Sequence, residues 1–216
     1  MIQNNVLLRT LLYSALTRYG SSYKLQIKLD EKKFMDELSH FADQWKKYNP
    51  EHKVERYGLS ITSLDGEFSG IPDLDSLRRY NKEHATNYTE LDFVKKTPLY
   101  ENVKDCLVHF EPYVRRSHVI KLGTGGFFPM HRDANGIDIV SFRLFIPLQR
   151  CNPPTMYFIL DNSVLRFEQG YVYFIDTCLE HVLFNASYTH EACFIVLNIE
   201  LTEESVNSVL SNKAIK

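Results

Sequence analysis

Short apolar runs rich in β-forming residues dominate the chain from residue 117 onwards, and turn-forming residues separate them. Such runs are typical of strands. Strands are predicted at residues 117–122, 127–133, 138–148, 155–160, 164–167, 171–176, 181–187 and 192–201. Turn-forming residues separate them at 123–126, 135–136, 152–154, 161–162 and 170. Seven or eight short strands at this spacing predict a β-sandwich or a barrel.

The first 116 residues carry a different pattern, in which apolar residues recur at helical spacing. Helices are predicted over 4–19, 30–48 and 98–114. Residues 56–88 are rich in Gly, Ser, Asp and Asn, which is typical of a loop, and a loop of this length is more often functional than idle.

The whole chain is therefore predicted to form one domain of the α+β class, mainly β. A helical layer with a substrate loop, Tyr57 to Tyr88, takes residues 1–116. A metal-binding β-barrel core takes residues 117–202, and a C-terminal tail takes 203–216.

Composition narrows the classes of function. The 216 residues hold 25 Lys and Arg against 27 Asp and Glu, a formal charge of −2. No basic field favours nucleic acid or an anionic membrane, so we expect a small-molecule or peptide substrate. No apolar run has the length of a signal peptide or a membrane span, and we expect a soluble, cytoplasmic protein. The four cysteines lack Cys-x-x-Cys spacing, which argues against a zinc ribbon and a disulfide framework.

One short motif carries candidate chemistry. His131 and Asp133 stand two residues apart on a predicted strand, after a paired-glycine turn. Residues with this spacing share one face of a strand, so the imidazole and the carboxylate can bind one metal ion. His181, on a strand late in the predicted barrel, is a candidate third ligand. Two histidines and a carboxylate form the facial triad of non-haem iron(II) enzymes, although catalytic zinc takes similar donors.

The surrounding segments resemble a known family of enzymes. They are "KLGTGGFFPMHRD", "SFRLFIPL", "GYVYFIDTCLEHVLFNAS" and "FIVLNIEL", and they are similar in this order to the aspartyl/asparaginyl β-hydroxylase family of iron(II)- and 2-oxoglutarate-dependent oxygenases. The resemblance covers roughly residues 117 to 200. The matching positions are Gly126, His131, Asp133, Arg143, Pro147, Leu148, Gly170, Phe174, Asp176, His181 and Asn185.

The resemblance implies a double-stranded β-helix, which is a cupin-like jelly roll, with the N-terminal helices packed against it. It implies Fe(II) as cofactor, bound by His131, Asp133 and His181, and 2-oxoglutarate as cosubstrate together with dioxygen. The reaction would be that of a dioxygenase, the hydroxylation of a substrate C–H bond. The retained Asp133 favours hydroxylation, because a halogenating relative would need that position vacated for chloride.

The chain departs from the family pattern at two positions. The family's Arg-x-His is Arg143-Leu144-Phe145 here, and Glu191 stands where members carry the Arg that binds the far carboxylate of 2-oxoglutarate. Arg143, Lys121, His118 and His190 are the candidates to bind the cosubstrate instead. Arg143 shares a strand face with Phe145, and an inward-pointing Arg needs a carboxylate partner such as a keto acid.

Two other functions stay open at this stage. One is a cupin-like module that binds a metal or a small acid without turnover, which the Glu191 departure favours. The other is a zinc or manganese enzyme that uses the same triad for hydrolysis or isomerisation. The substrate and the oligomeric state are open as well.

Overall fold

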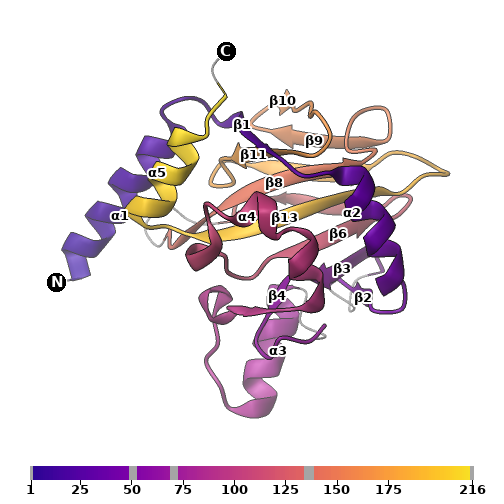
Figure 1. The fold of residues 1–216 in the computed structure, drawn as a ribbon, viewed down its shortest axis with the longest axis horizontal. Helices are drawn as coiled ribbons and strands as arrows, with labels where there is room; N and C mark the ends of the chain where they lie inside the picture. The colour runs from indigo at the N-terminus through magenta and orange to yellow at the C-terminus, as the bar shows by residue number, and fades with distance from the viewer. Residues whose placement is uncertain (1, 49–52, 69–72, 134–138, 215–216) are drawn as a thin grey trace.

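Two β-sheets form the centre of the computed structural model, which describes residues 2–48, 53–68, 73–133 and 139–214 (Figure 1). The larger sheet runs in the order β1 (Ser22–Lys28), β11 (Tyr171–Ile175), β8 (Ser141–Gln149), β13 (Ala192–Glu200), β6 (His118–Leu122), β3 (Arg56–Ser60) and β2 (Lys46–Lys47). The smaller sheet runs in the order β10 (Ser163–Val164), β9 (Met156–Leu160), β12 (His181–Asn185) and β7 (Phe127–His131). A further short pair joins β4 (Thr62–Ser63) to β5 (Lys95–Lys96).

The order of the strands identifies the fold. From β6 onwards the chain crosses between the sheets: β6, β8, β11 and β13 lie in the larger sheet, and β7, β9, β10 and β12 lie in the smaller one. All of these pairings are antiparallel. This alternation is that of a jelly roll, so the predicted α+β, mainly β, cupin-like double-stranded β-helix is confirmed.

The alternation of side chains along the strands divides the interior into two apolar clusters. On β8, Phe142, Leu144 and Ile146 pack in the cluster between the larger sheet and the helices. Phe145 points the other way, into the cluster between the two sheets. The inter-sheet cluster is strongly aromatic, since the ring of Phe145 lies 4.9 Å from that of Phe194. Successive residues of β8 therefore pack in different apolar clusters, on opposite faces of the larger sheet.

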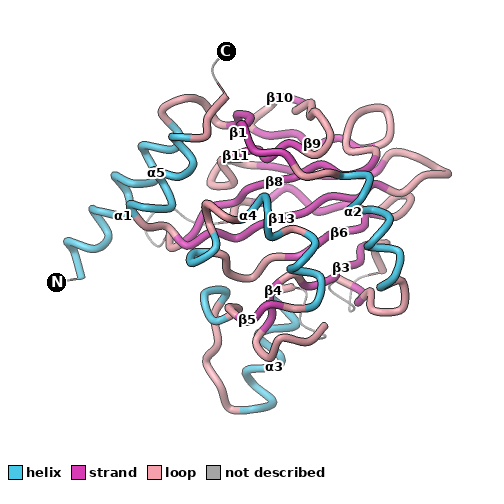
Figure 2. Tube along the Cα trace, viewed as in Figure 1, coloured by secondary structure: helices cyan, strands magenta, loops and turns pink. Residues whose placement is uncertain are grey.

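Helices cover the outer face of the larger sheet (Figure 2). They are α1 (Ile2–Thr17), α2 (Glu31–Leu38), α4 (Lys104–Leu107) and α5 (Glu203–Ser211), and α5 packs against α1. Another helix, α3 (Leu74–His84), lies apart from this layer, beside β4. Short 3₁₀ helices are η1 (Ser39–Phe41), η2 (Glu90–Asp92), η3 (Pro98–Asn102) and η4 (Glu111–Tyr113). None of the helices in the described ranges combines the length and apolar character needed to cross a membrane.

The N-terminal half differs from its predicted elements. The helix predicted to residue 48 ends at Leu38, because Lys46 and Lys47 pair with β3 and turn the chain towards the sheet. The helix predicted over 98–114 is broken into η3, α4 and η4, which lets Leu99, Leu107 and Phe110 all reach the core.

Other differences concern the predicted loop and tail. The loop from Tyr57 to Tyr88 contains β4 and α3, and α3 begins at Asp73, whose carboxylate accepts a hydrogen bond from Ser76 N. The C-terminal tail forms α5, with a capping box between Thr202 and Ser205. β1 and β3 come from the predicted helical layer and extend the larger sheet. The turn predicted at residues 135–136 lies outside the described residues.

Candidate metal centre

Strand pairing brings the three predicted ligands together. His131 ends β7, and His181 opens β12 directly opposite it in the antiparallel register. Their rings are 4.2 Å apart, centroid to centroid. Asp133 follows β7, where its N–H donates to the carbonyl of Thr177 at 2.9 Å. One donor atom from each of His131, Asp133 and His181 lies within 4.8 Å of the others, which is a spacing that one metal ion can close.

Backbone carbonyls hold both imidazole rings in place. Nδ1 of His131 lies 2.7 Å from the carbonyl oxygen of Pro129, and Nδ1 of His181 lies 3.0 Å from that of Leu179. In a neutral imidazole such a contact places the ring proton on Nδ1 and leaves Nε2 to bind a metal. Nε2 of His131 is 3.4 Å from Oδ1 of Asp133, so without a metal a protonated Nε2 interacts with the carboxylate. Both rings are oriented as metal-binding histidines are.

The local charges set the protonation states. Burial opposes ionisation of Asp133, but the charge of Arg143 and the hydrogen bond from His131 together lower its pKa well below the ordinary value. Burial lowers the pKa of His181, which favours the neutral imidazole. The hydrogen bond to Asp133 raises the pKa of His131. An ionised carboxylate and neutral imidazoles are the forms that bind a metal, so a cation would displace the proton shared by His131 and Asp133.

Arg143 lies next to this group, but each of its three nitrogens already has a protein partner. Its Nε lies 3.2 Å from Oδ2 of Asp133, and its Nη2 lies 3.2 Å from Oε2 of Glu90. Nη1 donates to Asn198 and Ser141. The sequence predicted that this inward Arg would pair with the carboxylate of a cosubstrate. The structure instead pairs it with two carboxylates of the chain itself.

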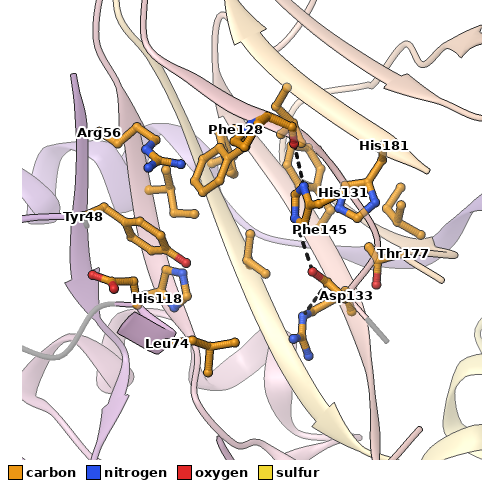
Figure 3. A pocket seen from close by; sticks show the side chains of 18 of the residues that line it. Tyr48, Arg56, Leu74, His118, Phe128, His131, Asp133, Phe145, Thr177 and His181 are labelled. Carbon is orange, nitrogen blue, oxygen red and sulfur yellow. Dashed lines mark hydrogen bonds and ion pairs between the residues drawn. The ribbon is translucent and has the colours of Figure 1, made fainter. Parts of the chain in front are cut away.

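A cavity of about 440 Å³ opens beside the three residues (Figure 3). The apolar part of its lining, which we call the apolar wall, includes Ile120, Phe145, Phe158, Leu183 and Phe194. The arginines of its lining, which we call the cationic wall, are Arg56, Arg78, Arg116 and Arg143. Tyr48 and His118 lie next to the cationic wall, and α3 contributes Leu74 and Asp75. The cavity can thus hold a small acid whose apolar part contacts the aromatic side.

The other residues predicted to bind a cosubstrate are divided by their strand faces. His118 lines the cavity and is 3% exposed. Lys121 stands on the opposite face of β6, where its ammonium lies over the ring of Trp45 at 4.9 Å and 3.9 Å from Glu191. His190 is exposed, in the turn before β13. Neither Lys121 nor His190 is among the residues that line the cavity.

Residues important to the cavity were missed by sequence reasoning. Glu90, in η2, binds Arg116 at 2.7 Å and Arg143 at 3.2 Å, although it is far from both in the chain. Arg56 and Tyr48 enter the cavity because β3 pairs with β6. The run that begins at Arg56 showed apolar–polar alternation, and this signal could have placed Arg56 and Tyr57 on opposite faces. It could not have shown which face points inwards.

Comparisons with known proteins add distant likenesses. No protein-family model and no curated protein matches the chain. It is similar to a viral collagen prolyl hydroxylase from Paramecium bursaria Chlorella virus-1, solved with 2-oxoglutarate, at 9% identity over 85% of this chain and 97% of that one, with a TM-score of 0.47. A prolyl-4-hydroxylase from Pseudomonas putida is 11% identical over 90% of this chain and 99% of that one, with a TM-score of 0.47.

A cupin domain of Schizosaccharomyces pombe Cnp3 is 12% identical, with a TM-score of 0.32. The match covers 42% of this chain and 58% of that domain, so the chain spans less than two thirds of its length. Because all of these similarities are weak, the function of the chain has to be argued from its own residues.

Proposed function

We propose that the chain is a non-haem iron(II)- and 2-oxoglutarate-dependent hydroxylase that acts on a C–H bond of an amino acid, a peptide side chain or a related metabolite. The observation that carries this proposal is the convergence of His131, Asp133 and His181 beside a cavity, with their donor atoms within 4.8 Å of one another. Two imidazoles and one carboxylate are the donor set of the facial triad. The proposal uses the same three residues as ligands that the sequence motif predicts.

The donor chemistry fits iron(II). His131 and His181 present Nε2 because their Nδ1 atoms are held by backbone carbonyls, and Asp133 is ionised. When bound by three such ligands, iron(II) leaves three coordination positions open and supplies the redox chemistry with dioxygen and 2-oxoglutarate. Asp133 supplies the ligand position that hydroxylases keep, which supports hydroxylation rather than halogenation.

The surrounding residues orient the ligands. Arg143 binds Oδ2 of Asp133 and leaves Oδ1 directed at His131, so it acts as a positioning residue for the carboxylate. Glu90 in turn holds Arg143 and Arg116. Outer partners of this kind fix the direction of a metal ligand and are typical of metal sites. The aromatic side chains of the apolar wall give the cavity an apolar surface beside the triad.

A second candidate function is a metal-dependent site that does not use 2-oxoglutarate. The observation that favours it is the position of the predicted anchors: Lys121 and His190 do not line the cavity, and Arg143 is bound to Asp133 and Glu90. Phe145 also places a ring where the family has a histidine. A carboxylate against that wall would have no charged partner, which is costly in a buried site.

Succinate formation separates the two candidates. Iron(II)-loaded protein is mixed with 2-oxoglutarate in air, and succinate is quantified for the wild type, for His181→Ala and for the zinc-loaded wild type as a redox-inert control. The proposal expects succinate from the iron-loaded wild type alone. Iron bound at one equivalent without any succinate would refute the use of 2-oxoglutarate and favour the second candidate.

A further inference from the structure

The cationic wall contains one guanidinium that forms no ion pair in the described part of the chain. Arg56 is 5% exposed, and its Nε is buried without a hydrogen-bond partner in the described part of the chain. Its guanidinium lies 4.6 Å from the ring centroid of Phe128 and 5.5 Å from that of Tyr48. Figure 3 shows it between these two rings, directed into the cavity. An arginine in this position is desolvated and held in place by aromatic contacts.

The other three arginines of the cationic wall differ in this respect. Arg116 and Arg143 share Glu90, and Arg143 also binds Asp133. Arg78 pairs with Asp75 at 2.7 Å. Within the described ranges, Arg56 is thus the arginine of this wall that forms no ion pair.

The charges of Asp73 and Asp75 act on Arg56, but neither carboxylate forms an ion pair with it. Asp73 lines the cavity too, but its carboxylate caps α3 by accepting hydrogen bonds from the N–H and the hydroxyl of Ser76 at 2.9 and 2.8 Å. Burial lowers the pKa of Arg56, yet an arginine stays charged at neutral pH. A buried guanidinium that no carboxylate contacts directly is unfavourable for the fold, because its lost hydration is not replaced by hydrogen bonds. An anionic ligand would supply those hydrogen bonds.

We propose that Arg56 anchors a carboxylate of a ligand whose other end reaches His131, Asp133 and His181. A guanidinium presents a planar fork that matches a carboxylate, and rings on its faces restrict it to in-plane contacts. Phe128, which contacts Arg56, stands three residues before His131 on β7, about 10 Å away by the rise of a strand. A short dicarboxylate and its contacts at both ends span such a distance.

This inference rests on the proposed function, because it takes the triad as the second attachment point. The carboxylate has two sources, the far carboxylate of 2-oxoglutarate or a carboxylate of the substrate. In the first case, Arg56 takes the role that the family gives to an arginine where this chain has Glu191. The ligand would lie between Arg56 and the triad, and its chain would contact the aromatic side chains of the apolar wall.

Calorimetric titration of the zinc-loaded protein tests the anchor without turnover. The variants are Arg56→Met, which keeps the apolar stem, Arg56→Lys, which keeps the charge but not the fork, and Arg166→Met, an exposed control. Loss of a charge-assisted pair is expected to weaken 2-oxoglutarate binding about 10- to 100-fold in Arg56→Met. A smaller loss is expected in Arg56→Lys and none in Arg166→Met. Pyruvate, which lacks the far carboxylate, should bind the wild type and Arg56→Met equally.

A second arm tests the substrate as the source. Free amino acids and their amides are titrated into zinc-loaded protein that is saturated with 2-oxoglutarate. If 2-oxoglutarate binds equally to all variants, a preference for the free acid that disappears in Arg56→Met assigns the carboxylate to the substrate and supports the anchor. If no ligand in either arm depends on Arg56, the proposal is overturned.

Thermal melting of the ligand-free protein separates an anchor from a structural residue. If Arg56 is kept for ligand binding and not for stability, Arg56→Met should melt at the same temperature as the wild type or higher. A clear drop would overturn the anchor role in favour of a structural one. Failure of the proposed function can be told apart from failure of the anchor. The proposed function fails if the iron-loaded enzyme forms no succinate, whereas the anchor is tested by binding to the zinc-loaded protein.

Discussion

Glu90 offers the sharpest test of how the candidate site is held together. Its carboxylate binds Arg116 and Arg143, and the three side chains are only 18%, 7% and 12% exposed. Burial alone would raise the pKa of Glu90, but Arg143 and Arg116 lower it below the ordinary value. The substitution Glu90→Gln keeps the shape and removes the negative charge that Arg116 and Arg143 share.

The expected cost follows from that burial. Breaking a buried ion pair by removing one partner destabilises a protein by about 3–5 kcal/mol, and the residual exposure of Glu90 places the expectation at about 3 kcal/mol. For a chain of this length that corresponds to a fall in melting temperature of about 6–12 °C. Circular dichroism melts and urea titrations of the metal-free protein measure it. Replacing Arg116 by Met in the same chain should restore part of the loss, since it removes one of the two cations that the charge of Glu90 balances.

Glu101→Gln is the matched control for this prediction. Glu101 pairs with Lys104 at 2.7 Å, a distance as short as that between Glu90 and Arg116, but both side chains are more than half exposed. Exposed pairs contribute little to stability, so this variant should melt with the wild type. If Glu90→Gln loses no more stability than Glu101→Gln, the ion pairs of Glu90 with Arg116 and Arg143 do not stabilise the folded protein.

The remaining predictions concern the fold around the site. A Cβ at Gly126 would collide with the backbone oxygen of Glu55, so Gly126→Ala should lower the free energy of unfolding by about 3 kcal/mol. Gly125 has a φ of 68° and open space where a Cβ would lie, so Gly125→Ala should lower it by only about 1 kcal/mol. Urea unfolding measures both values, and equal losses would contradict the close contact at Gly126. Burial, with the charges of Arg116 and Arg143, lowers the pKa of His118 well below 6.5. The unfolded chain therefore takes up this proton first, so stability is full above pH 6.5 and falls below it by up to about 1.4 kcal/mol per pH unit. Urea titrations from pH 7 to 5 should show a shallower fall in His118→Phe, and an unchanged slope would rule out His118 as the cause.

The strands of the core could be predicted because their residues form short runs rich in apolar and β-forming side chains. The runs that contain β6, β8, β11 and β13 carry this pattern clearly, and turn residues mark their ends. His131 and Asp133 were expected to lie close together from their spacing alone. The position of His181 opposite His131 needed the resemblance as well, because it depends on the antiparallel pairing of β12 with β7.

The partners of the site could not be predicted in the same way. Lys121 and Ile120 are neighbours in the chain, yet Ile120 lines the cavity and Lys121 contacts Trp45 on the other face. A shift of one residue in register exchanges the two faces, and the alternation of the sequence does not fix which face points inwards. Glu90 comes from a segment with no repeating pattern, and it contacts Arg143 only through long-range packing. Arg56 begins a short alternating run, but its place in the cavity depends on the pairing of β3 with β6.

Anaerobic addition of iron(II) and then 2-oxoglutarate to the purified protein, while the visible spectrum is recorded, tests the triad and the cosubstrate together. The wild type should give a metal-to-ligand charge-transfer band that is absent in His131→Ala. Wild-type protein that binds iron but gives no band would refute the binding of 2-oxoglutarate to iron at the triad. A band of equal strength in His131→Ala would contradict it as well, because the iron would then lie away from the triad.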